Sequence, residues 1–524
     1  MDNRNTERKS TEFMLIPEND RTQVNFFRKN VTTDLSSDFT LPDYMPEIRK
    51  MLGVSAKLSP ISRYIGGNGI EFSGRVDYDL IYTGGDGKLA SAPLGTDFSF
   101  EVQPEVPPHI DWNSSNDSFA DIETDMLHCR VTAPRKVNIK CRLHSLVRAY
   151  GYDEINDDIR DRNSGTERLI SEVKCSELHR RMSEVIELGD EIPLDTASEN
   201  IRPILSRGSV NISDVSESGN RLNCRGEVIT DIIYENTETN QTDSVTRKIP
   251  FTQEIDIGDE QNDTANTSAA HNVRGICGEV RVNIGDGKLL LDTEVILESD
   301  TAENIPVSVT QDIFMPGKEC KADYRDFRFE TVEKCANGIM NLTESIPLSD
   351  FSMSGESEII DCFGTVRTEG ISQDDGRISI NGSYKIRIIS KNGEEYSSGE
   401  LSLPYSFESG IAAADAPLSL IAKPIITDCR CRIEGENVIC ETEIMLPYCL
   451  LSEHVIRIVN CMECGDERMA ADSGINVYYP ASGETLWSVA KRFSAPLRSI
   501  AEANDLPSAK GNEDISSRHY ILIY

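Results

Sequence analysis

A pattern that repeats about every 150 residues constrains the fold of this chain more than any other feature. A run of nine residues that begins with glycine occurs three times, at 74–82, 226–234 and 382–390. Its glycines are 152 and then 156 residues apart. Since a chain of 524 residues is too long for one hydrophobic core, this self-similarity predicts three homologous domains in tandem.

Three further landmarks keep the same register around each glycine. A short Leu-Pro or Pro-Leu segment precedes it, at 39–42, 192–194 and 346–348. An aromatic residue follows it after 24, 25 and 23 residues, at Phe98, Phe251 and Tyr405. An alternating segment closes each unit, at 137–143, 289–295 and 438–444. Because a chance match of one strand would not preserve this order, the landmarks support true repeats.

Each landmark alternates apolar and polar residues and is rich in valine, isoleucine and tyrosine, which is typical of half-buried strands. Asp-Gly and Asn-Gly pairs supply hairpin turns between them. We predict a mainly β protein with three tandem antiparallel domains, each a sandwich or barrel-like fold. The predicted bounds are 24–155, 156–305 and 306–470 after a polar segment 1–23, followed by a small domain at 475–524. A short helix is expected around 172–186.

The charge and hydropathy exclude several classes of partner. The formal charge of −35 repels nucleic acids and anionic lipids, so neither is predicted as a ligand. All of this net charge lies before residue 475, because the last fifty residues hold five basic and five acidic side chains. No run approaches the roughly 18 apolar residues of a membrane helix. The polar start lacks the apolar segment of a secretion signal, so we expect a cytoplasmic protein without membrane insertion.

Fourteen cysteines are spread along the chain, and the densest group includes Cys429, Cys431, Cys461 and Cys464. Their C-x-C and C-x-x-C spacings are one way to build a zinc site. However, Cys429 and Cys431 alternate with arginines, as residues of a strand do. In a reducing compartment most of these thiols are expected to be small core residues. We therefore predict no metal site and no cofactor.

Catalytic motifs do not emerge from the sequence. The seven histidines are scattered without metalloprotease spacing, and no Gly-x-Ser-x-Gly turn is present. The glycine cluster at 84–87 precedes Lys88-Leu89 and lacks the Lys-Ser/Thr ending of a phosphate-binding loop. We predict a non-enzymatic protein, and a hydrolase with paired carboxylates is the alternative that the many acidic residues leave open.

The last fifty residues predict a separate small domain. Residues 477–480 form a strand candidate, and a turn then delivers Thr485 to a helix N-cap. Apolar residues follow at helical spacing, at Leu486, Val489, Ala490 and Phe493. Pro496 suits the start of a second helix, and residues 520–524 form a closing strand. The predicted order is β-α-α-β.

This segment, YYPASGETLWSVAKRFSAPLRSIAEANDL, resembles the LysM family. The resemblance implies a shallow groove that binds N-acetylated glycans in many members. On this chain the groove has two sides, one formed by Gly483, Glu484, Thr485, Leu486 and Trp487, and the other by Asn504, Asp505 and Leu506. Trp487 is left open between a groove role and a core role. The usual Pro-Gly turn before the last strand is replaced by 516–519, which puts glycan binding in doubt.

The segment 41–48, followed by three β units and a LysM-like end, resembles the SPOCS family of sporulation proteins. The resemblance implies a scaffold for spore-coat assembly in the mother-cell cytoplasm, at the forespore surface. It also implies that the LysM-like end contacts a SpoIVA-like coat-basement ATPase. The alternative is a protein that binds peptidoglycan in the cell wall or spore cortex through its N-acetylated glycan chains.

Overall fold

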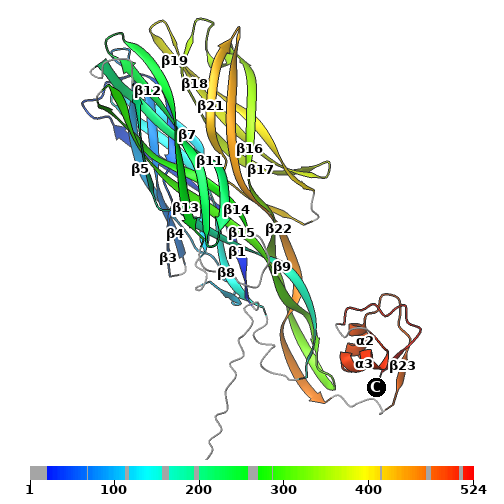
Figure 1. Cartoon of the computed structure of the whole chain (residues 1–524). Helices are drawn as coiled ribbons and strands as arrows, with labels where there is room; N and C mark the ends of the chain where they lie inside the picture. Colours follow the sequence, from blue (N-terminus) through cyan, green and yellow to red (C-terminus); the bar gives the residue numbers. More distant parts are fainter. Residues whose placement is uncertain are drawn as a thin grey trace, which may run out of the picture.

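The computed structural model describes residues 21–67, 69–112, 117–155, 165–193, 200–257, 269–285, 287–412, 416–467, 474–506 and 511–523. Antiparallel β-sheets make up nearly all of this part of the chain, as predicted. Its two α-helices both lie near the C-terminus (Figure 1). No helix among the described residues is long and apolar enough to cross a membrane.

Each third of the body contributes two sheets. In the first unit, one sheet contains β1 (Arg21–Thr40), β6 (Ile110–Asp111), β7 (Ser118–Ala133) and β8 (Lys136–Glu154). The other contains β2 (Ile48–Leu58), β3 (Ser62–Gly66), β4 (Gly69–Gly84) and β5 (Leu89–Val102). The strands β8 and β4 are the central members, since each pairs with the other strands of its sheet.

The second and third units repeat this plan. In the second, β9 (Glu167–Met182), β10 (Ile186–Pro193) and β14 (Ala270–Gly285) pair with β15 (Lys288–Phe314), beside a sheet of β11 (Ile201–Ser218), β12 (Arg221–Asn236) and β13 (Gln241–Asp256). In the third, β16 (Lys318–Pro347), β20 (Leu418–Ala422) and β21 (Ile425–Glu434) pair with β22 (Asn437–Glu467). Its other sheet contains β17 (Glu358–Asp374), β18 (Arg377–Asn392) and β19 (Glu395–Ala412), after a short 3-10 helix, η3 (Leu348–Phe351).

Two of the four repeated landmarks of the sequence are the central strands of these sheets. The segments that begin at the three glycines lie in β4, β12 and β18, and the closing segments lie in β8, β15 and β22. In each unit the apolar residues of the two central strands share one core. Alternate residues of a strand point to one face, so the alternation in the sequence faces this core. The units are therefore sandwich-like, as predicted.

The conserved spacing between glycine and aromatic residue has a direct structural cause. Gly226 on β12 lies opposite Phe251 on β13, and Gly382 on β18 lies opposite Tyr405 on β19. Gly74 and Phe98 pair in the same way. In each pair the aromatic ring lies across the glycine, in the space that a Cβ atom would need. The repeat therefore keeps glycine because a cross-strand aromatic ring covers it.

Substituting one of these glycines tests this explanation. Gly382→Ala is expected to lower the free energy of unfolding by about 1–3 kcal/mol, because the added methyl group collides with the Tyr405 ring and the Arg367 carbonyl oxygen. Urea unfolding measures the loss. The matched control is Gly355→Ala, where a Cβ atom meets nothing within 4 Å. Equal stability of the two variants would contradict the explanation.

The prediction of a helix around 172–186 is wrong. Strand β9 occupies this region and pairs residue by residue with β15, from Glu167 opposite Phe314 to Met182 opposite Glu298. Cys175 and Leu178 are buried in the structure. The segment is rich in good helix formers, and pairing with a long neighbouring strand overrides that local preference.

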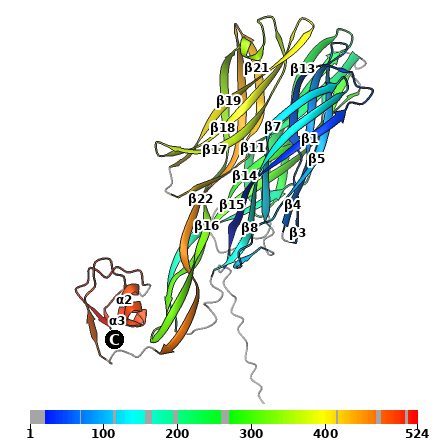
Figure 2. The same cartoon turned by 180° about the vertical axis from the view of Figure 1, so that it is seen from behind.

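Four long strands continue beyond the sandwiches as a narrow arm, which we define as the paired ends of β9, β15, β16 and β22. Figures 1 and 2 show the arm extending away from the sandwiches, with the small C-terminal domain beside its end. A separate apolar core holds the arm together, and it includes Val307, Val309, Phe327, Phe329 and Ile458. The turn at the arm tip connects β15 to β16 and contains Gly317 in a left-handed conformation.

Candidate functional site in the C-terminal module

The C-terminal module, defined here as the described residues from 474 onward, has the predicted β-α-α-β order. Strands β23 (Asn476–Tyr478) and β24 (Ile521–Ile523) pair antiparallel, and α2 (Leu486–Phe493) and α3 (Leu497–Ala503) lie between them in the chain. Its buried core contains Leu486, Trp487, Val489, Ala490, Ala495, Leu497, Ile500, Ala501, Ile515, Ile521 and Ile523. Phe493 instead lies at the edge of the module, where it is 37% exposed and packs edge-on against Tyr478.

The residues on the first side of the predicted groove have structural roles within the module. Gly483 forms the left-handed turn that leads into α2. The Thr485 hydroxyl accepts a hydrogen bond from the Ser488 amide as the helix N-cap. The Leu486 side chain is fully buried in the core. These three residues therefore have structural roles that are independent of a ligand.

Glu484 anchors the same turn through its carboxylate. This group accepts hydrogen bonds from the Ala481 amide at 2.8 Å and from the Tyr478 hydroxyl, and it pairs with Arg492 at 2.7 Å. These interactions, led by the amide of Ala481, lower the pKa of Glu484. The carboxylate is thus a fixed acceptor whose partners belong to the module itself.

The second side of the predicted groove also has structural partners. The Asn504 side-chain amide donates to the carbonyl oxygens of Ile500 and Leu522 and accepts from the Leu522 amide, so it ties α3 to β24. Leu506 is half-buried against the core. Asp505 is exposed and has a positive φ of 49°.

The two sides do not share hydrogen bonds among the described residues. The turn of 484–487 instead pairs with 511–515, through Leu486 to the Glu513 carbonyl, Trp487 to the Gly511 carbonyl and Ile515 to the Glu484 carbonyl. Ligand binding by the predicted groove residues therefore remains a prediction.

Trp487 packs against the arm. Its ring is 5% exposed and lies edge-on to Phe314, with the two ring centroids 5.0 Å apart. Its indole nitrogen Nε1 donates to Asp312 Oδ2 at 2.8 Å. The sequence leaves a groove role and a core role open for Trp487. In the structure its side chain is packed at the contact between the module and the arm.

Asp312, near the end of β15, collects several donors from both sides of that contact. Besides Trp487, it accepts from the Tyr324 hydroxyl at 2.6 Å and pairs with Lys491 Nζ at 2.5 Å. Burial alone would raise the pKa of Asp312, and the donors Lys491, Tyr324 and Trp487 outweigh burial and lower this pKa. The carboxylate therefore stays ionised and acts as a latch. Sequence reasoning missed it because it lies 175 residues before Trp487.

Further contacts hold the module on the arm tip. The Gly317 amide donates to the Ser494 carbonyl oxygen and to the Ser494 hydroxyl at 3.0 Å. The Leu497 amide at the start of α3 donates to Glu167 Oε1 at 3.2 Å. The module is thus joined to both β9 and the turn between β15 and β16.

The opposite face of the module is open to solvent and rich in aromatic and apolar residues. Successive side chains of a strand alternate between faces, so Tyr478, Ile521 and Ile523 face the core and their neighbours face outward. We define the outward group as the aromatic face, which consists of Ile475, Val477, Tyr479, His519 and Tyr520. The Tyr479 and Tyr520 side chains are 65% and 50% exposed.

The aromatic face has the composition of a binding surface. His519 contacts both tyrosines edge-on, with ring centroids 5.9 Å from Tyr479 and 6.3 Å from Tyr520. Clustered exposed apolar side chains are unusual on a monomer surface and mark interaction sites. Tyrosine is enriched at such sites because it offers a large apolar ring and a polar hydroxyl.

Comparison with known proteins gives a match to a family model. Residues 200–273 match the family model described as "SipL, SPOCS domain". The matched segment contains β11, β12 and β13 and the start of β14, in the second unit, and it does not extend to the C-terminal module. No curated protein and no solved structure gives a match. Residues 200–273, in the second unit, are therefore similar to a SPOCS domain of the SipL type.

Proposed function

We propose that this chain is a non-enzymatic scaffold in spore-coat assembly and that its C-terminal module binds a protein partner through the aromatic face. The SPOCS match supports a role related to sporulation. The observation that carries the binding proposal is the exposure of Tyr479 and Tyr520 on a module that is latched to the arm by its other side.

The arrangement of the module favours a protein as partner. Its predicted groove residues cap α2, fill the core or tie β24 in place, whereas the aromatic face has no comparable structural task. An apolar centre with tyrosines, surrounded by polar residues, is the usual anatomy of a protein interface. The arm holds this face away from the acidic sandwiches (Figure 1). A partner can therefore reach the module without contacting the sandwiches.

The partner that the family resemblance implies is a SpoIVA-like coat-basement ATPase in the mother-cell cytoplasm. Binding to the purified ATPase, measured by calorimetry with the full chain, tests this directly. The Tyr479→Ala/Tyr520→Ala variant is expected to weaken binding about 30-fold or more, because truncating two central aromatic residues removes roughly 2–4 kcal/mol.

A matched control separates the aromatic face from exposed tyrosines in general. Tyr44 and Tyr64 lie in the first unit and are 83% and 68% exposed. The Tyr44→Ala/Tyr64→Ala variant is expected to bind like the unchanged chain. If both double variants bind normally, the aromatic face is not the interface.

The second candidate ligand is the N-acetylated glycan of peptidoglycan. Exposed tyrosine rings also present apolar faces on which sugar rings pack, which favours this alternative. Co-sedimentation of the full chain with insoluble peptidoglycan distinguishes the two ligands. Pelleting that depends on Tyr479 and Tyr520, without binding to the ATPase, would replace the protein proposal by the glycan one.

A further inference from the structure

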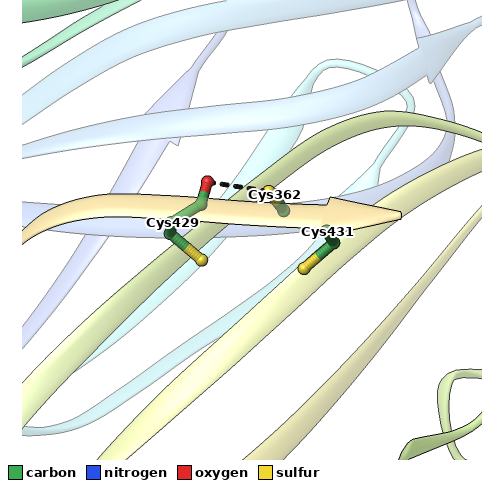
Figure 3. Close-up of side chains that lie close together, drawn as sticks. All are labelled: Cys362, Cys429 and Cys431. Carbon is green, nitrogen blue, oxygen red and sulfur yellow. Dashed lines mark hydrogen bonds between the residues drawn. The ribbon is translucent and has the colours of Figure 1, made fainter. Parts of the chain in front are cut away.

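Three cysteine side chains of the third unit converge on one place, and a fourth lies beside one of them. Cys429 and Cys431 lie two residues apart on β21 and therefore point to the same face, and Cys440 on β22 lies directly opposite Cys431. Cys362 comes from β17, in the facing sheet of the sandwich. Figure 3 shows Cys362 beside the strand that carries Cys429 and Cys431.

The distances between these thiols suit a metal ion. The Sγ atoms of Cys362, Cys429 and Cys431 all lie within 4.8 Å of one another. The Sγ atoms of Cys431 and Cys440 are 3.3 Å apart. Tetrahedral zinc with Zn–S bonds of about 2.3 Å places its sulfur ligands about 3.8 Å apart. The three thiols are therefore close enough to share one zinc ion, and Cys440 lies next to Cys431.

A donor group lies beside these thiols. The Cys362 thiol donates to the backbone carbonyl oxygen of Cys429 at 3.0 Å, which brings β17 against β21. The buried Thr442 hydroxyl lies opposite Cys429 on β22 and forms no hydrogen bond to another described residue. An unused hydroxyl beside a sulfur is the kind of donor that supports a metal-bound thiolate.

Core packing alone does not explain the arrangement. A buried cysteine serves as a small apolar residue wherever it stands, so packing gives no reason for four thiols from three strands to meet. A close sulfur contact elsewhere, between Cys320 and Cys464 at 3.2 Å, is a simple cross-strand pair. A set of three or four thiolates that surround one point is instead the ligand set of structural zinc.

We propose that Cys362, Cys429 and Cys431 bind one Zn²⁺ ion, with Cys440 as the fourth ligand. The ion joins β17 to β21 and β22 and thereby cross-links the two sheets of the third sandwich. Each thiol loses its proton to the solvent on binding, so the site gains affinity as pH rises. This inference is independent of the proposed binding partner.

The full chain, purified under reducing conditions and loaded with zinc, is expected to retain about one metal ion per chain after gel filtration. Cobalt loaded in its place is expected to show the strong near-ultraviolet charge-transfer band of thiolate ligands. Cys362→Ser and Cys429→Ser are expected to lose the retained metal, and Cys440→Ser to keep it more weakly with a reduced band. The control is Cys461→Ser, on the arm portion of β22, which is expected to retain the metal fully.

A measurement without substitutions guards against variants that fail to fold. Zinc is expected to raise the thermal midpoint of the unchanged chain, and a chelator to lower it again. The proposal is overturned if the loaded chain holds no more metal than Cys362→Ser. It is equally overturned if thiol titration of the chain as purified shows a disulfide between Cys431 and Cys440, because an oxidised pair cannot supply the ligands.

Discussion

Replacing Lys423 with methionine is expected to lower the free energy of unfolding by about 3–5 kcal/mol, because it removes one charge from a buried ionic network. Lys423 lies between β20 and β21 of the third unit and is 8% exposed. Its Nζ atom pairs with Asp121 of the first unit at 2.9 Å and with Glu298 of the second unit. One side chain thus connects all three units.

Three arginines complete the network, among them Arg148 on β8, which pairs with Asp121 at 2.5 Å. Arg180 on β9 pairs with Asp121 at 3.0 Å and with Asp300 at 2.6 Å, and Arg274 on β14 pairs with Glu298 at 3.1 Å. Asp121, Lys423 and Arg274 also line an open pocket of about 1300 Å³ that residues of all three units border. Removing one partner of a buried pair leaves the other charge unpaired in a place that water solvates poorly.

The network also sets the dependence of stability on pH. Burial would raise the pKa values of Asp121 and Glu298, but the nearby arginines and Lys423 hold both well below the ordinary values of 3.8 and 4.5. The folded state therefore keeps these carboxylates ionised at pH values where the unfolded chain protonates them. Their contribution is present above about pH 4.5 and is lost as pH falls towards the folded pKa values.

Urea unfolding at pH 7 and pH 4 checks both parts of this prediction. Lys423→Met is expected to be less stable than the unchanged chain at pH 7. Without the lysine charge, the folded-state pKa values of Asp121 and Glu298 rise towards those of the unfolded chain. The variant is therefore expected to lose less free energy of unfolding than the unchanged chain when the pH falls from 7 to 4. The control is Lys385→Met, an exposed position on β18. Adding Glu298→Gln to Lys423→Met should restore part of the stability. An unchanged midpoint for Lys423→Met would show that the network does not hold the units together.

Features that depend on local pattern could be predicted from the sequence. The strands that begin at Gly74, Gly226 and Gly382 are present because alternation along a strand is a short-range signal. The order of elements in the C-terminal module follows from capping and helical spacing around Thr485 and Pro496. The repeated spacing between the glycine and the aromatic residue can also be read from the sequence. Only the strand register in the structure shows that the two residues of each pair are in contact.

Features that depend on distant polar residues could not be predicted. Nothing near Lys423 in the sequence indicates Asp121 or Glu298 as its partners, since charged residues are most often solvated surface. Cys362 lies 67 residues before Cys429, outside the cysteine group that the spacing rules picked out. In the same way, the local sequence around Trp487 is compatible with a groove residue, a core residue or an interface residue. Only the position of the arm shows that Trp487 packs at an interface.

Substituting Asp312 with alanine is expected to release the C-terminal module from the arm. The substitution leaves the Trp487 indole, the Lys491 ammonium and the Tyr324 hydroxyl without their shared acceptor. Hydrogen bonds to a charged group contribute about 1.5–3 kcal/mol each, so the docked state loses several kcal/mol. The remaining contacts are the hydrogen bonds that Ser494 and Leu497 make with the arm. Phe314 and Leu169 also pack against the module core. We expect these contacts to be too weak to keep the module in one position.

The chain is well suited to measuring this release because it has two tryptophans. Labelling with fluorotryptophan gives one resonance from Trp112 in the first unit and one from Trp487. In Asp312→Ala the Trp487 resonance is expected to move and sharpen, since the module gains freedom, while that of Trp112 stays in place. Small-angle scattering should show a larger radius of gyration.

Two further variants decide whether the charge or the acceptor is responsible. Asp312→Asn keeps an oxygen acceptor for Trp487 but loses the attraction to Lys491, and we expect an intermediate population of released module. Asp326→Ala, at an exposed position on β16 of the arm, should leave both resonances unchanged. If Asp312→Ala does the same, the packing of Phe314 against Trp487 and the hydrogen bonds of Ser494 and Leu497 are enough to hold the module. In that case the aromatic face keeps its orientation without the latch, because the edge-on ring contact still fixes which side of the module meets the arm.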